Sequence, residues 1–448
     1  MSELKIGFAQ VDFTPKVNLP LLGNFRDTYE ARGVHDPLMA KSAVFSDAKG
    51  NLGAILALDL CMVSRANVGF LRKEISSKTK IGEKNIFISA THTHAAPAPM
   101  AYGVLPAASE KDVKSFLSKA ALAVVEAKRR MKPRALHAGS TRESGVSFVR
   151  RLRGRDGKTR MNWERPEPAS IEKVLGEIDP ELSVLAAGDP ANPDGLIVHF
   201  GLHPAILAGN NWDYSADYPG VIASTLSRLL GKKDLVIVFL TGCCGNVNHL
   251  DYLDPLQGRG FKEVERIGTA LGLATFDALQ KTKKLKGNRV AIVSEKVSVP
   301  RHSITDTQLV WAKKILAGEE KDGGLVDGLP PNQFATQYVK MAEVQHLPDE
   351  CEVQAIRIGD AAILGFPGEV FAETGTEVKK KSPAKVTLPV MLAGDAVGYL
   401  PTRKAYAEGG YESLVGSTLY APGAVERLRD AGIDILRKLF KQTQGVRS

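Results

Sequence analysis

The feature that most constrains the fold of this chain is the stretch NIFISATHTHAAPAP at residues 85–99. It begins as a short apolar run and ends in Ala-Pro-Ala-Pro, which can form neither a helix nor a central strand. The run predicts a buried strand that stops just before His92 and His94. Residues two apart point to the same side of extended backbone, so we expect the two imidazoles to leave the strand end together. They are either hydrogen-bonded scaffold or a metal or acid–base site, since α/β sheets bind ligands at strand ends.

The rest of the chain alternates β-rich apolar runs with amphipathic helical stretches, which is typical of an α/β protein. Strand pairs are predicted around the turns at 47–53 and 359–360. Helices are predicted over 67–78, 111–130, 221–230, 261–279, 306–316, 332–343, 371–379 and 423–440. No repeat or long linker interrupts this pattern. We therefore expect one domain over 1–448, with mixed twisted β-sheets flanked by helices and an active site at the C-terminal ends of strands.

Composition and charge narrow the class of protein. Of 448 residues, 44% are hydrophobic and 24% are charged, as in a soluble enzyme. The chain lacks a run of ~18 apolar residues and a signal-peptide pattern. The net charge of +9 is scattered, without the aromatic residues of single-strand binding, and the four cysteines suit a reducing compartment. We expect a cytoplasmic enzyme with a small-molecule substrate, no nucleic-acid partner and no stable membrane insertion; the sequence predicts no oligomeric state.

Three more predicted strands are each followed by a ligand-type side chain. His203 precedes a proline, His249 lies in the glycine-rich loop TGCCGNVNH, and Glu369 follows Pro-Gly. Two histidines and a glutamate from distant strands suit a catalytic zinc ion, which typically has three protein ligands and a water. Zinc makes hydroxide available at neutral pH, and a neighbouring imidazole can move the proton. By contrast, we expect His199 to be a core histidine and Asp59 to be a buried hydrogen-bond anchor.

An arginine-dense stretch, SFVRRLRGRDGKTR at 147–160, has two interpretations. Its Asp-Gly pair marks a tight turn, which favours an exposed hairpin. Alternatively, the stretch is a substrate-facing loop in which Arg150 or Arg151 binds a carboxylate or a carbonyl group through its fork of N–H donors.

The chain resembles the neutral/alkaline (non-lysosomal) ceramidase family on motifs that run through most of its length. The segments that carry the resemblance are IGFAQVDFTP, GVHDPLMAKSAVF, LALDLCMVS, SATHTHAAP, YSADYPG, GCCGN, GFPGE and GYLPTRKAYAEGGYE. The resemblance implies a neutral-ceramidase-like catalytic domain in which His92, His203, Glu369 and Tyr399 bind Zn²⁺. It also implies that His94 supports the metal site or transfers a proton.

The resemblance further implies that Tyr411, and with it Arg150 or Arg151, lies in segments that face the substrate. Neutral ceramidases carry an additional C-terminal immunoglobulin-like domain and a secretory or membrane-anchoring N-terminus, and we expect neither in this chain. Where they have Ser-Pro-Asn after the glycine-rich loop, this chain reads Asn-Val-Asn-His at 246–249. These departures predict that the substrate has changed.

The predicted function is that of a zinc-dependent hydrolase, an amidohydrolase that cleaves the amide (N-acyl) bond of a small polar substrate through zinc-activated water. The same site would suit the hydrolysis of an ester or a lactone, and the sequence does not separate these reactions. A further alternative is a non-hydrolytic zinc lyase or isomerase acting on a sugar-like substrate. In that case, His249 would be an added acid–base group.

Overall fold

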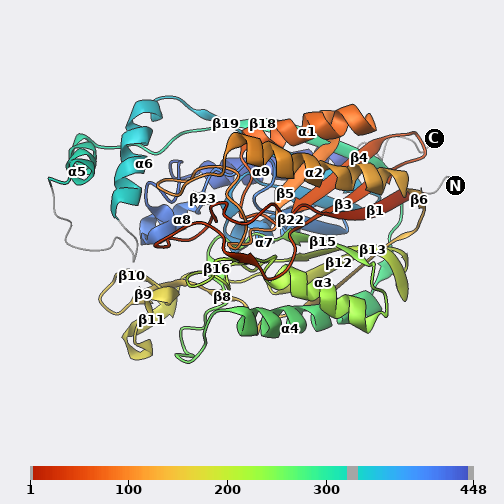
Figure 1. The fold of residues 1–448 in the computed structure, drawn as a ribbon, viewed down its shortest axis with the longest axis horizontal. Helices are drawn as coiled ribbons and strands as arrows, with labels where there is room; N and C mark the ends of the chain where they lie inside the picture. The colour runs from red at the N-terminus through yellow and green to blue at the C-terminus, as the bar shows by residue number, and fades with distance from the viewer. Residues whose placement is uncertain (1–3, 320–330, 442–448) are drawn as a thin grey trace.

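The N-terminal part of the chain forms a five-stranded sheet covered by two helices (Figure 1). The structure is a computed structural model, and it describes residues 4–319 and 331–441. In order across the sheet, the strands are β5 (Ile86–Ala90), β4 (Leu52–Leu58), β3 (Met39–Ser46), β1 (Lys5–Asp12) and β6 (Lys132–Pro133). α1 (Arg65–Thr79) and α2 (Glu110–Arg129) pack on one face, and a serine side chain caps the start of each helix.

A second five-stranded sheet follows in the middle of the chain. In order across it, the strands are β15 (Val236–Thr241), β13 (Asn192–Phe200), β12 (Glu181–Asp189), β7 (Leu136–Arg142) and β17 (Lys283–Lys284). α3 (Tyr218–Leu229) and α4 (Phe261–Gln280) cover one face through an apolar cluster shared with β12, β13 and β15. Because β13 and β15 are parallel, their C-terminal ends lie at the same edge of the sheet.

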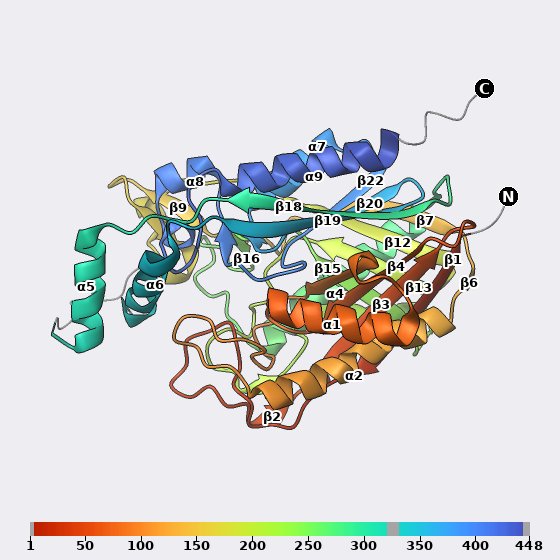
Figure 2. The same ribbon diagram turned by 90° about the horizontal axis from the view of Figure 1, so that it is seen from above.

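A four-stranded sheet completes the centre of the protein. Its strands are β18 (Val290–Val299), β19 (Asp349–Ile358), β20 (Ala361–Gly365) and β22 (Val386–Val390). α7 (Ala372–Lys381) and α9 (Ala424–Lys441) cover its outer face, on the side away from α1 and α2 (Figure 2). The inner faces of all three sheets meet in one apolar core, which includes Phe45, Ile197 and Ile356.

Shorter elements surround these sheets. They are β2 (Gly33–Val34), β8 (Phe148–Val149), β9 (Arg151–Gly154), β10 (Thr159–Met161), β11 (Ile171–Val174), β14 (Asp213–Tyr214), β16 (Val247–Asn248), β21 (Glu369–Val370), β23 (Tyr399–Leu400), α5 (Asp306–Ala317), α6 (Pro331–Val344) and α8 (Arg403–Glu408). α5 and α6 pack against each other and lie at one end of the molecule in both views (Figures 1 and 2).

The predicted α/β class is confirmed, and each predicted helix is present. The hairpins β3–β4 and β19–β20 are antiparallel, as predicted. The largest shift is in α3, which begins at Tyr218 rather than at 221, because the Asp217 side chain accepts the Tyr218 N–H and Pro219 fits the first turn.

The C-terminal ends of strands from all three sheets converge on one region. The N–H of Ala90, at the end of β5, donates to the carbonyl oxygen of Leu392 beyond β22. The N–H of Met391 donates to the carbonyl oxygen of Thr241 in β15, and the Thr241 hydroxyl donates to the Thr91 carbonyl oxygen. These bonds bring segments more than a hundred residues apart to the place where His92 follows β5.

Within residues 4–319 and 331–441, no helix combines the length and the apolar character that crossing a membrane requires.

Candidate metal site

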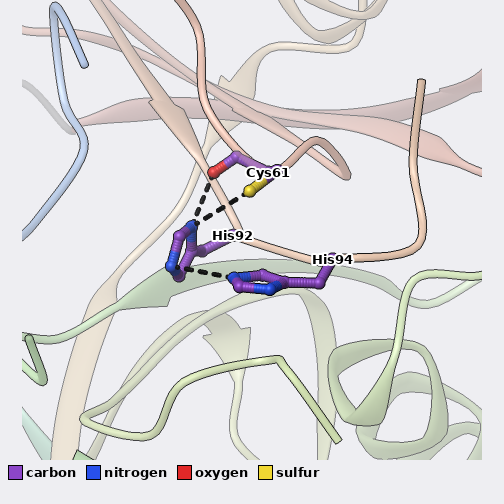
Figure 3. A group of neighbouring side chains, drawn as sticks. All are labelled: Cys61, His92 and His94. Atoms are coloured by element: carbon purple, nitrogen blue, oxygen red, sulfur yellow. Dashed lines mark hydrogen bonds between the residues drawn. The ribbon is translucent and has the colours of Figure 1, made fainter. Parts of the chain in front are cut away.

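His92 and His94 face each other, but not for the reason that the sequence suggested. β5 ends at Ala90, and the backbone of His92 is left-handed, with a φ of 74°. Non-glycine residues rarely adopt this conformation, and those that do cluster at functional sites. The two ring centroids are 4.7 Å apart, with 3.3 Å between the Nε2 atoms (Figure 3). The rings do meet, but the prediction that extended backbone brings them together is wrong.

The imidazoles of His92 and His203 are both oriented by backbone carbonyl groups. Nδ1 of His92 lies 2.7 Å from the carbonyl oxygen of Cys61, and Nδ1 of His203 lies 2.9 Å from that of Cys244. A carbonyl oxygen can only accept, so each Nδ1 carries a hydrogen and Nε2 is the nitrogen left to bind a metal ion. Metal-binding histidines commonly donate their second nitrogen in this way. Burial also lowers the pKa of His203 to about 4, which keeps this ring neutral.

Glu369 completes a group of three ligand atoms. Its Oε2 lies 3.0 Å from Nε2 of His203 and 3.3 Å from Nε2 of His92. The ligand atoms of the three side chains lie within 4.8 Å of one another, and all three residues are buried. Lone pairs that converge away from water repel one another unless a cation or a proton lies between them. The donor set of two imidazoles and one carboxylate therefore fits a divalent metal ion.

The glycine-rich loop after β15 holds two of these residues in place. The Cys244 carbonyl group orients His203, and the N–H of Gly245 donates to the carbonyl oxygen of Val370, next to Glu369. A Cβ atom on Gly245 would lie only 2.4 Å from the Glu369 carbonyl oxygen. Any larger residue at this position would push the strand that carries Glu369 away from the loop.

Tyr399 and Tyr411, which the family resemblance places at the site, line the same cavity as His92 and Glu369. Tyr399 lies directly opposite Glu369 in the parallel pair β21–β23. Its ring centroid is 6.4 Å from that of His203 and 5.3 Å from that of Tyr411. Burial raises the pKa of Tyr399 well above its ordinary value and that of Tyr411 to about 12, so both hydroxyl groups are neutral at pH 7.

Arg150 and Arg151 lie at the start of a hairpin, but both side chains are buried rather than exposed. The two arginines share one carboxylate. Nε of Arg150 lies 2.8 Å from Oε1 of Glu412, and Nη1 of Arg151 lies 2.7 Å from Oε2. Arg151 also donates to the carbonyl oxygens of Ala405 and Gly409, so it holds the segment that follows α8. The role of Arg151 in this arrangement is structural.

Arg150, by contrast, packs against Tyr399 and Tyr411, which line the cavity, although Arg150 itself is not among the described lining residues. Its guanidinium carbon lies 5.1 Å from the ring centroid of Tyr399 and 5.9 Å from that of Tyr411. Its Nη2 is buried and has no hydrogen-bond partner within the part of the chain that the structure describes. A buried donor without a partner is rare and costly. Nε of Arg151 is likewise buried without a partner among the described residues, so it is the contact with the two tyrosine rings that makes Arg150 the better candidate to bind a substrate oxygen.

The cavity, of about 50 Å³, also brings in residues that sequence reasoning missed. They include Cys61, Tyr102, Gln333 and Phe334. Cys61 could have been found, because it follows β4, the parallel neighbour of β5, and both strands end at the same edge. Gln333 and Phe334 come from α6, and nothing in their local sequence signals a site.

His249 does not join this group. The preceding residues form β16, which pairs with β8, and Asn248 bonds to the side chain of Asn162, so the chain turns away from the cavity. Nε2 of His249 lies 3.3 Å from the carbonyl oxygen of Gly258. Among the described residues that line the cavity, His249 is absent. The prediction that His249 is catalytic finds no geometric support, because the contact of Asn248 with Asn162 directs this segment away from the metal-binding group.

The two structural interpretations of buried polar residues agree with the geometry. Nε2 of His199 lies 2.8 Å from the carbonyl oxygen of Pro389 in the core. Asp59 accepts from Nζ of Lys41 at 3.0 Å and from the hydroxyl group of Thr91 at 3.3 Å. Asp59 thus anchors the turn that leads into the histidine pair.

The buried neutral state of His249 predicts a pH-dependent stability. Burial, with the charge of Arg259 nearby, lowers the pKa of His249 from 6.5 to about 4. Between these values the unfolded chain binds more protons than the native protein, so stability is lost as the pH falls. From this residue we expect a loss of about 2 kcal/mol in the free energy of unfolding between pH 7 and pH 5. Urea unfolding should show that His249→Gln loses less than the wild type; equal losses would contradict this assignment.

The fold and the buried cluster define an α/β protein with a candidate metal site where strands end. The family model "Neutral/alkaline non-lysosomal ceramidase, N-terminal" matches residues 4–247, which is more than half of the chain. The chain therefore belongs to the neutral/alkaline non-lysosomal ceramidase family, which places it among the hydrolases.

Individual members of this family align with nearly the whole of this chain. The neutral ceramidase of Pseudomonas aeruginosa is 23% identical over 477 residues, which cover 93% of this chain and 69% of that protein. Neutral ceramidase A of Dictyostelium discoideum is 24% identical over 517 residues, covering 94% and 70% respectively. The crystal structure of the Pseudomonas aeruginosa neutral ceramidase matches with a TM-score of 0.74 at 20% identity, over 99% of this chain and 75% of that chain. At this level of identity, the structural match establishes the fold.

Proposed function

We propose that this protein is a zinc-dependent hydrolase that cleaves the amide bond of a small polar N-acyl compound. The observation that carries the proposal is the convergence of buried ligand atoms from His92, His203 and Glu369 within 4.8 Å, at the wall of the cavity that His92 and Glu369 line. Catalytic zinc typically has three such protein ligands and keeps a further position open. Following the family resemblance, Tyr399, which lies opposite Glu369, is proposed as an additional ligand.

In this proposal, His94 moves the proton. Zinc, when bound, polarises a carbonyl group and lowers the pKa of water to about 7. Nδ1 of His94 lies 3.3 Å from the side-chain oxygen of Asn24, and its Nε2 lies 3.3 Å from Nε2 of His92. With its hydrogen on Nδ1, His94 presents Nε2 as an acceptor next to the ligand group. It can therefore take a proton from the attacking water and pass it to the leaving amine.

Arg150 is proposed to bind the oxygen on which negative charge develops. Its buried Nη2 is an unused donor beside Tyr399 and Tyr411. Burial with Glu412 fixes the guanidinium group before the substrate arrives. Donors held in position away from water stabilise developing charge without a cost of reorganisation.

The names of the relatives support the reaction, and the changed residues at 246–249 support a changed substrate. The relatives are named ceramidases, and ceramide is an amide, so amide hydrolysis is the reaction we carry over to this chain. At about 50 Å³ the cavity is smaller than any substrate of either class, so its walls must move apart for a small amide as well as for a lipid, and the substrate panel decides between them.

The lyase or isomerase alternative depended on His249 as an added acid–base group. Because His249 lies outside the cavity, no observation of the structure favours that alternative over hydrolysis. The choice between an amide and an ester or lactone depends on the reaction itself.

A substrate panel tests the proposal. Purified, zinc-loaded protein would be incubated with N-acetylated amino acids, N-acetylated amino sugars, matched esters, lactones and a short-chain ceramide in detergent. We expect a mass gain of one water in the summed products, and the highest kcat/KM for a small amide. Faster turnover of ceramide than of every small amide would overturn the substrate class, and products without added water would overturn hydrolysis.

Replacing Arg150 by lysine tests its part in the reaction. Lysine keeps the charge beside Glu412 but loses the planar fork of donors. We expect kcat to fall by about 10²-fold, as for the loss of one donor to a developing oxyanion. KM should change little, and urea unfolding of the same preparation would show that the variant is folded. An unchanged kcat in a folded Arg150→Lys variant would remove Arg150 from the mechanism.

A further inference from the structure

The cavity contains a second group of ligand atoms, in which Cys61 is the member that the proposed function does not use. Cys61, His92 and His94 each offer one ligand atom, and these atoms lie within 4.8 Å of one another. Sγ of Cys61 lies 3.6 Å from Nδ1 of His92, and the Nε2 atoms of the two histidines are 3.3 Å apart (Figure 3). All three side chains are buried and line the cavity, so an ion that enters the cavity can reach each of them.

The two groups differ in chemical character and share one member. The first contains the carboxylate of Glu369, whereas the second has the thiol of Cys61 in that role. Thiolates favour soft metal ions, and a coordinating thiol loses its proton to solvent when the metal binds. Nδ1, the His92 atom that lies 3.6 Å from Sγ, already donates to the Cys61 carbonyl oxygen, so an ion bound by this group takes Nε2 of His92. One nitrogen cannot serve two ions, and the two groups therefore compete for His92.

We propose that Cys61, His92 and His94 form an alternative site for a thiophilic divalent ion, such as Cd²⁺ or Zn²⁺ in excess. On binding, the S–H bond of Cys61 breaks, the proton leaves to solvent and a sulfur–metal bond forms, with no change of oxidation state. Occupation of this site withdraws His92 from the first group and blocks Nε2 of His94. The ion therefore inhibits the enzyme, a consequence that rests on the proposed function, whereas the binding site itself does not.

Cys61 differs from the other cysteines in ways that provide a matched control. Cys351 is bonded to the hydroxyl group of Tyr420 at 3.1 Å. Sγ of Cys244 lies 3.8 Å from Nδ1 of His203, much as Cys61 lies beside His92. Within the described ranges, however, Cys244 neither lines the cavity nor belongs to a group of three ligands. Replacing Cys244 thus removes a thiol next to a ligand histidine without removing the proposed site.

The binding test uses cadmium on the full-length protein after treatment with EDTA. We expect the ultraviolet absorption of a cadmium–thiolate bond to grow and saturate at about one ion per chain, since the groups share His92. The absorption should be lost in Cys61→Ser and Cys61→Ala and retained in Cys244→Ser. It should also persist in Glu369→Gln, which removes a ligand only of the first group. Absence of the band in wild-type protein, or its persistence in folded Cys61→Ser, would overturn the alternative site.

The inhibition test uses the zinc-loaded enzyme and reports activity relative to each variant without added metal. Excess Zn²⁺ or Cd²⁺ should inhibit the wild type, and Cys61→Ser should require at least about tenfold more metal for the same inhibition. Equal sensitivity of the two proteins would refute inhibition through Cys61. A cadmium–thiolate band in a protein without hydrolase activity would leave the alternative site standing and remove the proposed function. If zinc binds through Glu369 but no cadmium–thiolate band appears, the proposed function stands and the alternative site is refuted.

Discussion

Glu369→Gln is expected to lower kcat/KM by about 10³-fold, because a catalytic metal supplies several kcal/mol of charge stabilisation. Oε2 of Glu369 is the atom that lies 3.0 Å from His203 and 3.3 Å from His92. Glutamine has nearly the same shape but no negative charge to offset a divalent ion. The variant should therefore keep its fold and lose most of its bound metal. Steady-state kinetics and metal analysis on the same preparation would measure both effects.

Glu373 provides the matched control for this substitution. It lies four residues further along, in the first turn of α7, and is partly buried, but its carboxylate accepts from the side chain of Asn246 and from the N–H of Glu177. We expect Glu373→Gln to keep its metal and most of its activity. If Glu373→Gln and Glu369→Gln lose metal equally, general damage to this region rather than loss of a ligand explains the result.

Glu412→Gln is expected to have the largest effect on stability, lowering the free energy of unfolding by about 3–5 kcal/mol. Glu412 is fully buried, and its two oxygens bind Arg150 at 2.8 Å and Arg151 at 2.7 Å. Burial opposes its ionisation, but the two adjacent guanidinium groups hold its pKa below the ordinary value. Without the negative charge of Glu412, the positive charges of Arg150 and Arg151 would stay buried with no carboxylate between them to offset the cost of burial. Urea unfolding at neutral pH would measure the change.

An exposed ion pair serves as the reference for Glu412. Glu126 lies 2.8 Å from Arg129 on the surface of α2. Surface pairs of this kind contribute about 0–1 kcal/mol, so Glu126→Gln should be nearly neutral. A loss below about 1 kcal/mol in Glu412→Gln would mean that the buried triad does not hold the arginine segment in place.

The sequence predicted the regular elements well because their signals are local. The apolar spacing of α2 and the turn between β19 and β20 are both readable within about twenty residues. The sequence also indicated His92, His203 and Glu369 as ligands, because each follows a predicted strand. In the structure their ligand atoms lie within 4.8 Å of one another. Periodicity alone would not have selected Tyr399, which entered through the family resemblance.

The parts that the sequence did not predict depend on distant contacts. The left-handed backbone of His92 is held by its N–H bond to the carbonyl oxygen of Leu60, in the segment that follows β4. Arg150 is buried because Glu412, 262 positions away, neutralises it. His249 leaves the site because its segment pairs with β8. These three features depend on tertiary packing, so no pattern of neighbouring residues in the sequence predicts them.

The most direct test of the central claim is X-ray absorption spectroscopy at the zinc edge on wild-type protein loaded with stoichiometric zinc. The proposed site of His92, His203, Glu369 and Tyr399 predicts about one zinc per chain, bound by nitrogen and oxygen atoms that include two imidazoles. A protein that binds no zinc, or a zinc ion bound by sulfur at this stoichiometry, would contradict the account.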